Sequence, residues 1–187
     1  MAFALRLFQR TLRCIGHAER WLGVGLIAIM VGAITTQVFT RYLFNRPIIW
    51  VEEIATYSFI WAVFVGASLG LKYSRHVKIE TFVEHLAPRA KAASRVLVNL
   101  IIIAVLWLLV REVGTVINIE SRSTSVSLPW PVPRAWFYSI PLAASCVSMM
   151  ATCVYFILAE IAMIVGVEGL DTSSGIMGLR PTADVRI

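Results

Sequence analysis

Charge is what this sequence has least of. Only 15% of its 187 residues are Asp, Glu, Lys or Arg, whereas 58% are hydrophobic. Soluble domains usually carry charge on about a quarter of their residues, so the chain is not expected to be an ordinary soluble domain. A membrane-spanning helix needs about 20 consecutive, mainly apolar residues, and the chain has room for several.

Catalytic motifs are the second absence. The sequence has no Gly-x-x-x-x-Gly-Lys phosphate loop and no His-Glu-x-x-His. Its histidines, His17, His76 and His85, fall outside the middles of the apolar segments, where a haem-binding pair would lie. Neighbours on a helix point about 100° apart, so Glu52 and Glu53 do not converge on one bond. We predict no enzyme, no cofactor and no metal; a lipid-modifying membrane enzyme is the main enzymatic alternative.

Long apolar segments are what the sequence does have. They predict an all-α integral membrane protein with one membrane domain, residues 21–165, and four transmembrane helices. The predicted spans are about 21–44, 49–71, 96–118 and 136–165. Residues 166–187 contain Gly, Ser and Asp and are predicted to form a mobile tail.

The net charge of +6 is unevenly distributed. Twelve of the 17 Lys and Arg lie in residues 1–20, residues 72–95 and the C-terminal tail. Because positive charge gathers on the cytoplasmic side of membrane proteins, both termini and the second connection are predicted to be cytoplasmic. A basic surface for nucleic acid is the less favoured interpretation.

Residues 1–20 form a basic, amphipathic segment rather than the continuous apolar core of a cleaved signal peptide. Leu5, Phe8, Leu12 and Ile15 share one helical face, and arginines gather on the other. This pattern predicts a helix lying on the inner membrane surface. A frayed basic leader before the first span is an equally weighted alternative.

The second span has two contrasting faces. One is bulky and aromatic and carries Trp50, Ile54, Tyr57, Trp61 and Phe64. The opposite face carries Glu52, Thr56, Phe59, Val63, Gly66 and Gly70. Small residues four apart let a second backbone approach closely in a membrane, so both faces are expected to pack against something.

Charged residues also gather where the first two spans meet. Arg41 precedes the short turn Asn45-Arg46-Pro47, which contains Arg46, and Glu52 and Glu53 follow it. A carboxylate at this depth must be paired or face protein or water. We predict a structural ion-pair cluster at the outer rim. A substrate or cation site, or contact with polar groups of a partner, are the alternatives.

The connection after the second span predicts a short interfacial helix over about residues 77–87, because Ile79, Phe82, Val83 and Leu86 form an apolar stripe. The residues predicted to anchor this side to lipid are Lys72, Arg75, Lys78, Phe82, Leu86, Arg89 and Lys91. An ordinary cytoplasmic loop held by charge is the alternative.

The longest outer connection, residues 119–135, contains three prolines, which stiffen it. Such a loop suits docking of a periplasmic partner, or it serves only as the entry to the fourth span. The four spans lack the repeated halves and broken helices common in secondary transporters. An accessory or scaffold subunit is therefore favoured, with a small membrane anchor of a redox or other enzyme complex as the alternative.

Several short motifs occur in a specific order. They are Trp50-x-Glu52-Glu53, Trp61, Gly66-Ala67, Arg75-His76-Val77-x-Ile79-Glu80 and, over residues 128–141, LPWPVPRAWFYSIP. Together they resemble the small membrane subunit (DctQ-like) of TRAP transporters, the tripartite ATP-independent periplasmic transporters. The resemblance covers roughly residues 21–160.

This resemblance implies a four-helix subunit of the bacterial inner membrane that braces a large membrane subunit. A periplasmic binding protein would deliver an organic acid, such as a C4-dicarboxylate or sialic acid, and an ion gradient would drive uptake. It assigns Trp50, Glu52 and Glu53 to a W-x-E-E element, Gly66 to close packing, and His76 to the histidine after the second helix. Membrane lipids are expected partners, whereas nucleic acid is not.

Overall fold

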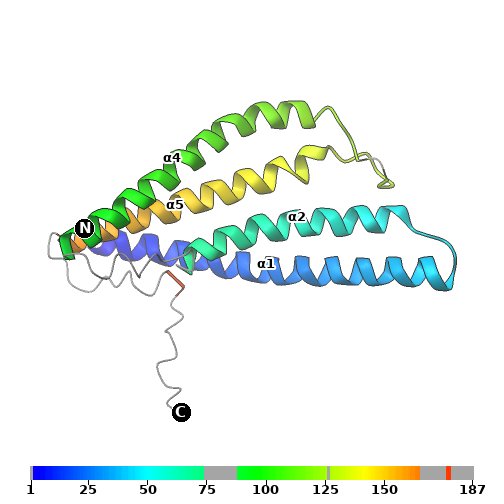
Figure 1. Ribbon diagram of the computed structural model, residues 1–187, viewed down its shortest axis with the longest axis horizontal. Coiled ribbons are helices and arrows are strands. Elements are labelled where there is room, and N and C mark those ends of the chain that lie inside the picture. The colour runs from blue at the N-terminus through cyan, green and yellow to red at the C-terminus, as the bar shows by residue number, and fades with distance from the viewer. Residues whose placement is uncertain (1, 74–87, 126, 165–175, 178–187) are drawn as a thin grey trace, which may run out of the picture. The chain divides into compact units, whose positions relative to one another are not determined.

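The computed structural model describes residues 2–73, 88–125, 127–164 and 176–177. Within this part of the chain the structure is helical (Figure 1), and four of the helices are long and apolar enough to cross a membrane. The elements are α1 (Ala2–Leu43), α2 (Ile49–Lys72), α4 (Pro88–Glu120), the short 3-10 helix η1 (Arg134–Trp136) and α5 (Ser139–Ile164). The predicted four-helix, all-α membrane architecture is confirmed at this level.

Helix α1 differs from its prediction. Instead of a separate segment over residues 1–20 and a span from 21, one helix runs unbroken from Ala2 to Leu43. No proline occurs before Pro47, so nothing in the sequence removes a backbone donor or forces a kink. The buried residues Leu5 and Leu12 lie on the predicted apolar face, whereas Ile15 is exposed.

A tight turn ends α1. Asn45 adopts a left-handed conformation with φ of 51°, which Asn tolerates better than most residues. The backbone N–H of Arg46 donates to the carbonyl of Thr40 at 3.2 Å. The turn brings α2 back beside α1, and a Cβ built on Gly23 would lie 3.7 Å from Cγ1 of Val65 (Figure 1).

The helices contribute to two compact units. The first gathers Met1–His17, Ser68–Leu108 and Val147–Ile187, and the second gathers Ala18–Ala67 and Leu109–Cys146. In the first unit Leu12, Tyr155, Phe156, Ala159 and Ile176 form a buried cluster. Close van der Waals packing of these side chains stabilises the contact between the helices that carry them.

The four helices differ in how much of their apolar surface the protein covers. The fraction of buried residues is 6% in the apolar stretches of α1 and of α4. It is 33% in α2 and 39% in the stretch that contains α5. Large exposed apolar surfaces would be a liability in water, but lipid tails cover them in a bilayer. α2 and α5 therefore supply most of the internal packing.

The predicted interfacial helix over about residues 77–87 lies outside the described residues. So do Arg75, His76, Lys78, Phe82 and Leu86, because residues 74–87 are not described. The sides of the membrane assigned to the two termini also stay predictions. Of the C-terminal segment, Ile176 and Met177 are described, and the side chain of Ile176 is buried.

Candidate functional site

The two faces of α2 have different environments in the second unit. On the aromatic face, Tyr57 is only 5% exposed. On the opposite face, Phe59 and Val63 are 54% and 49% exposed. One face is thus used inside the chain, while the other is open.

The aromatic face is held by the segment that leads into α5. The ring of Tyr57 stacks on Phe137, with centroids 3.7 Å apart and an interplanar angle of 3°. Tyr138 meets the same ring edge-on at 5.8 Å and 88°. The indole N–H of Trp61 donates to the carbonyl of Trp136 at 3.2 Å. Aromatic pairs add stabilisation beyond their buried area, so this contact fixes α2 in the second unit.

Glu53 is part of the same contact. One carboxylate oxygen accepts a hydrogen bond from the hydroxyl of Tyr57. The other accepts from the backbone N–H of Ser127 at 2.9 Å. Hydrogen bonds to an ionised acceptor are stronger than neutral ones. Glu53 therefore ties its own helix to a residue 74 positions away.

Sequence reasoning singled out Glu53 and predicted arginine partners for it. The described contacts of its carboxylate are with Tyr57 and Ser127, and pairing of Glu52 or Glu53 with Arg41 or Arg46 stays a prediction. Tyr57, four residues after Glu53, gave a helical-spacing signal for the first contact. A backbone donor in a distant loop gave none.

The loop containing Ser127 is closed on itself by backbone hydrogen bonds. Thr124 and Pro133 form an isolated antiparallel bridge. The N–H of Ser125 donates to the carbonyl of Val132 at 2.9 Å, and the N–H of Arg134 donates to the carbonyl of Ser123 at 2.9 Å. The predicted stiff connection is thus a narrow hairpin-like loop, which carries the exposed side chain of Trp130.

The open face of α2 consists of Glu52, Thr56, Phe59, Val63 and Gly66, all of which are exposed. The hydroxyl of Thr56 donates to the carbonyl of Glu52 at 3.0 Å, so this threonine is satisfied within its own helix. A Cβ built on Gly66 would meet nothing within 4 Å. The predicted close approach at Gly66 is therefore not made by the described part of this chain.

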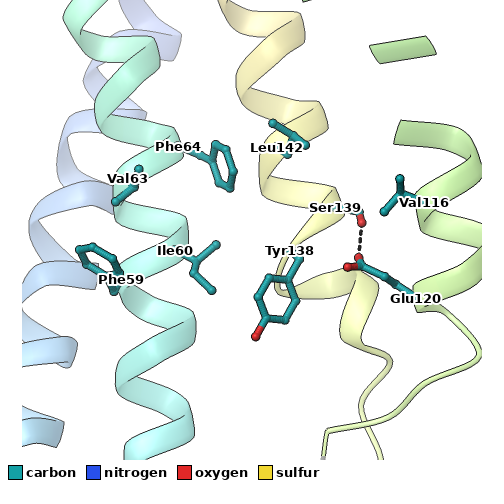
Figure 2. Close-up of a pocket in the computed structure, with 9 residues that line it drawn as sticks. All are labelled: Phe59, Ile60, Val63, Phe64, Val116, Glu120, Tyr138, Ser139 and Leu142. Carbon is teal, nitrogen blue, oxygen red and sulfur yellow. Dashed lines mark hydrogen bonds between the residues drawn. The ribbon is translucent and has the colours of Figure 1, made fainter. Parts of the chain in front are cut away.

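An apolar hollow of about 390 Å³ adjoins the open face. Figure 2 shows Phe64 of α2 and Leu142 of α5 pointing toward each other across it. The lining residues are Phe59, Ile60, Val63, Phe64, Val116, Glu120, Tyr138, Ser139 and Leu142. Ser139 donates a hydrogen bond to the carboxylate of Glu120, which satisfies a polar pair at this wall. The hollow suits an apolar side chain or an acyl chain rather than a charged substrate.

Lys72, predicted to contact lipid head groups, is fully buried in the first unit, with 0% exposure. Its ammonium donates to the hydroxyls of Ser68 at 3.3 Å and Ser148 at 2.7 Å. A buried charge needs such partners because desolvation is costly. This burial does not support the head-group role, which stays a prediction.

An ion pair that the sequence did not predict also lies in the first unit. Arg95 of α4 donates to Glu160 of α5 at 3.1 Å, and the two side chains are 47% and 7% exposed, respectively. Both residues lie near the predicted inner ends of their spans. This shared depth in the membrane was the one feature of the sequence from which the ion pair could have been predicted.

The remaining predicted residues are placed as follows. Trp50 is exposed at the start of α2, and Gly70 is half-buried near its end. Arg89 and Lys91 lie in the first turns of α4, but their side chains are outside the described set. Among the described residues, no three His, Cys, Asp or Glu side chains gather in a way that would hold a metal ion.

The described residues contain four apolar helices of membrane length, which is typical of a multi-pass membrane protein. Residues 30–163 match the family of the DctQ component of tripartite ATP-independent periplasmic transporters. The match spans well over half of the chain, which therefore belongs to this family. The description of this family is that of a transporter component, not of an enzyme.

Individual relatives agree with this assignment. The chain is 35% identical over 79 residues to the sialic acid TRAP transporter small permease protein SiaQ of Vibrio cholerae serotype O1, covering 42% of the chain and 46% of the relative. It is 36% identical over 95 residues to the C4-dicarboxylate TRAP transporter small permease protein DctQ of the same organism, covering 43% of the chain and 40% of the relative.

A further match is to a longer protein. The sialic acid TRAP transporter permease protein SiaT of Haemophilus influenzae is 25% identical over 99 residues, covering 53% of the chain and 16% of the relative. Each of these three alignments spans less than half the length of the relative.

Proposed function

We propose that this chain is the small scaffold subunit of a TRAP transporter and braces a large membrane subunit during uptake of an organic acid. The observation that carries this proposal is the division of α2 into a satisfied face and an open face. Tyr57 and Glu53 are used inside the chain. The opposite face, including Gly66, is exposed, so it is available to a second membrane protein.

Packing at Gly66 gives this contact its physical basis. Lipid tails are as apolar as leucine, so helices associate in a membrane through close packing and hydrogen bonds rather than apolar burial. A position where a Cβ would meet nothing within 4 Å lets a partner backbone come near. The adjacent hollow, with Phe59 and Val63 at its wall, would receive apolar side chains from the same partner.

The transport step itself is assigned to the large subunit. In this proposal the small subunit enlarges a static scaffold against which the transport domain moves, and an ion gradient rather than ATP drives uptake. Two relatives of similar identity carry the names of different substrates, sialic acid and a C4-dicarboxylate. We therefore propose an organic acid as the substrate class.

The hairpin-like loop is the proposed contact for the periplasmic binding protein. Its backbone bridge between Thr124 and Pro133 and the hydrogen bond from Ser127 to Glu53 limit its freedom. A pre-ordered loop loses little conformational entropy on binding. Trp130, exposed on this loop, is the kind of residue that anchors protein interfaces.

The topology that suits this function places the termini in the cytoplasm and the hairpin-like loop in the periplasm of an inner-membrane protein. Reporter fusions at Met1, after residue 187 and beside Trp130 test it. Fusions at the termini are expected to report a cytoplasmic location, and the loop fusion a periplasmic one. The reverse pattern would contradict the assignment.

Assembly is tested by co-purification of the chain from its native membrane in mild detergent. One large, multi-helix membrane protein is expected at about equal amount. Gly66→Leu should reduce its recovery several-fold, since close backbone approach is lost. Gly114→Leu on α4 is the matched control, because a Cβ at Gly114 also meets nothing within 4 Å. Equal recovery with both variants would contradict the assignment of the interface to α2.

A further inference from the structure

Ile176 and Met177 belong to the segment that the sequence predicts to be a mobile tail, but these two residues pack against the helices. Ile176 has 0% exposure, and both of its backbone polar groups are engaged. The surroundings of this one residue involve three helices of the first unit: α1, α2 and α5.

The backbone of Ile176 connects α1 with the end of α2. Its N–H donates to the carbonyl of Lys72 at 3.0 Å. Lys72 is the last residue of α2, and the carbonyls of a final helical turn have no partner within their own helix. The carbonyl of Ile176 accepts from Nε of Arg13 at 3.3 Å. Ile176 thus supplies a hydrogen-bond donor to a carbonyl at the end of α2 and a hydrogen-bond acceptor to the guanidinium of Arg13 on α1.

The side chain of Ile176 completes an apolar cluster. It packs with Leu12 of α1 and with Tyr155, Phe156 and Ala159 of α5. Leu12 is the centre of the apolar face of the N-terminal part of α1 and is 1% exposed. Without the side chain of Ile176, part of the apolar surface of this cluster would be exposed.

Met177 adds a second contact on α1. A Cβ built on Gly16 would lie 2.8 Å from the sulfur of Met177, so the methionine rests directly on the glycine backbone. Methionine fills such irregular gaps well because its side chain is unbranched and polarisable. Two consecutive residues therefore cover one stretch of α1, from Leu12 to Gly16.

We propose that Ile176–Met177 is a clasp that holds the amphipathic N-terminal part of α1 against the ends of α2 and α5. This part of α1 is fixed by protein contacts rather than by the lipid surface that its amphipathic pattern predicts. Loss of the clasp releases the helix as far as Gly16 and uncovers Leu12. This inference is independent of the large subunit and is tested on the isolated full-length chain.

The first test measures proximity by disulfide formation in the full chain in detergent. Cys14, which is exposed, is replaced by Ser in every variant, and the double variant Leu12→Cys/Ile176→Cys is mildly oxidised. Digestion and mass spectrometry are expected to find the cross-linked peptide pair in most molecules. The matched control, Ile15→Cys/Ile176→Cys, uses an exposed position of α1 and should stay at background. Equal yields from the two pairs would overturn the clasp.

The second test measures the consequence of breaking the contact. Ile176→Asp buries a charge, whereas Ile176→Val keeps most of the apolar contact. The Asp variant is expected to melt about 5 °C or more below the Val variant. Trypsin should also cleave it faster after Arg10 and Arg13. Identical melting and cleavage for the two variants would overturn the proposal. Should Ile176→Asp fail to fold, the disulfide comparison still decides.

Discussion

The two ends of α2 differ in how a charged side chain is hydrogen-bonded. Each carries a charged side chain on a helix long enough to cross a membrane. Near its start, the carboxylate of Glu53 is held by the hydroxyl of Tyr57 and by a loop backbone N–H. At its end, the ammonium of Lys72 is held by the hydroxyls of Ser68 and Ser148.

The difference is in what each partner does when the charge is removed. The backbone N–H of Ser127 and the stacked ring of Tyr57 are fixed in place, so their donors would be left without an acceptor. Serine hydroxyls rotate and can bond to a carbonyl of their own helix. Removal of the charge at Glu53 should therefore cost more folding free energy than removal of the charge at Lys72, and stability measurements on variants test this ranking.

The largest effect is expected from reversing the charge at Glu53. Glu53→Lys leaves the donors of Tyr57 and Ser127 facing a cation and should cost roughly 3–5 kcal/mol. The readout is the yield and melting temperature of purified protein. Glu53→Gln retains a carbonyl acceptor and should cost about 1–2 kcal/mol. A Glu53→Lys protein that folds and assembles normally but loses ion coupling would instead indicate an ion site.

A smaller effect is expected from the ion pair between Arg95 and Glu160. Arg95→Ala removes a partner from a carboxylate whose side chain is 7% exposed and should cost about 2 kcal/mol. Glu160→Gln should cost about 1 kcal/mol or less, since Arg95 is 47% exposed and reaches water. Thermal unfolding of the two variants and their double variant measures this asymmetry. A reversed order would show that Arg95, not Glu160, depends on the pair.

The smallest effect is expected at Lys72. Lys72→Met removes the ammonium but keeps most of the buried stem, and Ser68 and Ser148 can turn to backbone carbonyls. The expected loss is about 1 kcal/mol or less, measured by thermal unfolding beside Glu53→Gln. A loss as large as that of Glu53→Lys would abolish the distinction between the two ends of α2.

Periodicity was sufficient to predict much of this architecture. The apolar segments predicted four membrane helices, and helical spacing separated the face with Tyr57 from the face with Gly66. That spacing left open which face serves the interior of the chain. The structure answers this through the stack with Phe137, which depends on a residue far along the sequence.

Other features had no local signal. The hydrogen bond from Ser127 to Glu53 depends on the path of a loop backbone, which composition does not encode. Ile176 lies in the short stretch Gly175-Ile176-Met177-Gly178, which has no helical or strand periodicity, so no pattern pointed to its burial. The predicted boundary near residue 20, between a surface segment and the first span, followed from a change in composition, but α1 continues through it because no proline or cap interrupts the helix.

The claim that the open face of α2 binds a large membrane subunit is tested most directly by photo-crosslinking in intact membranes. A photoreactive amino acid at Val63 on that face is compared with one at Leu108, an equally apolar, exposed position of α4. The account predicts that position 63 gives a cross-link to one large membrane protein and that position 108 gives mainly lipid adducts. A cross-link from position 108 with none from position 63 would contradict it.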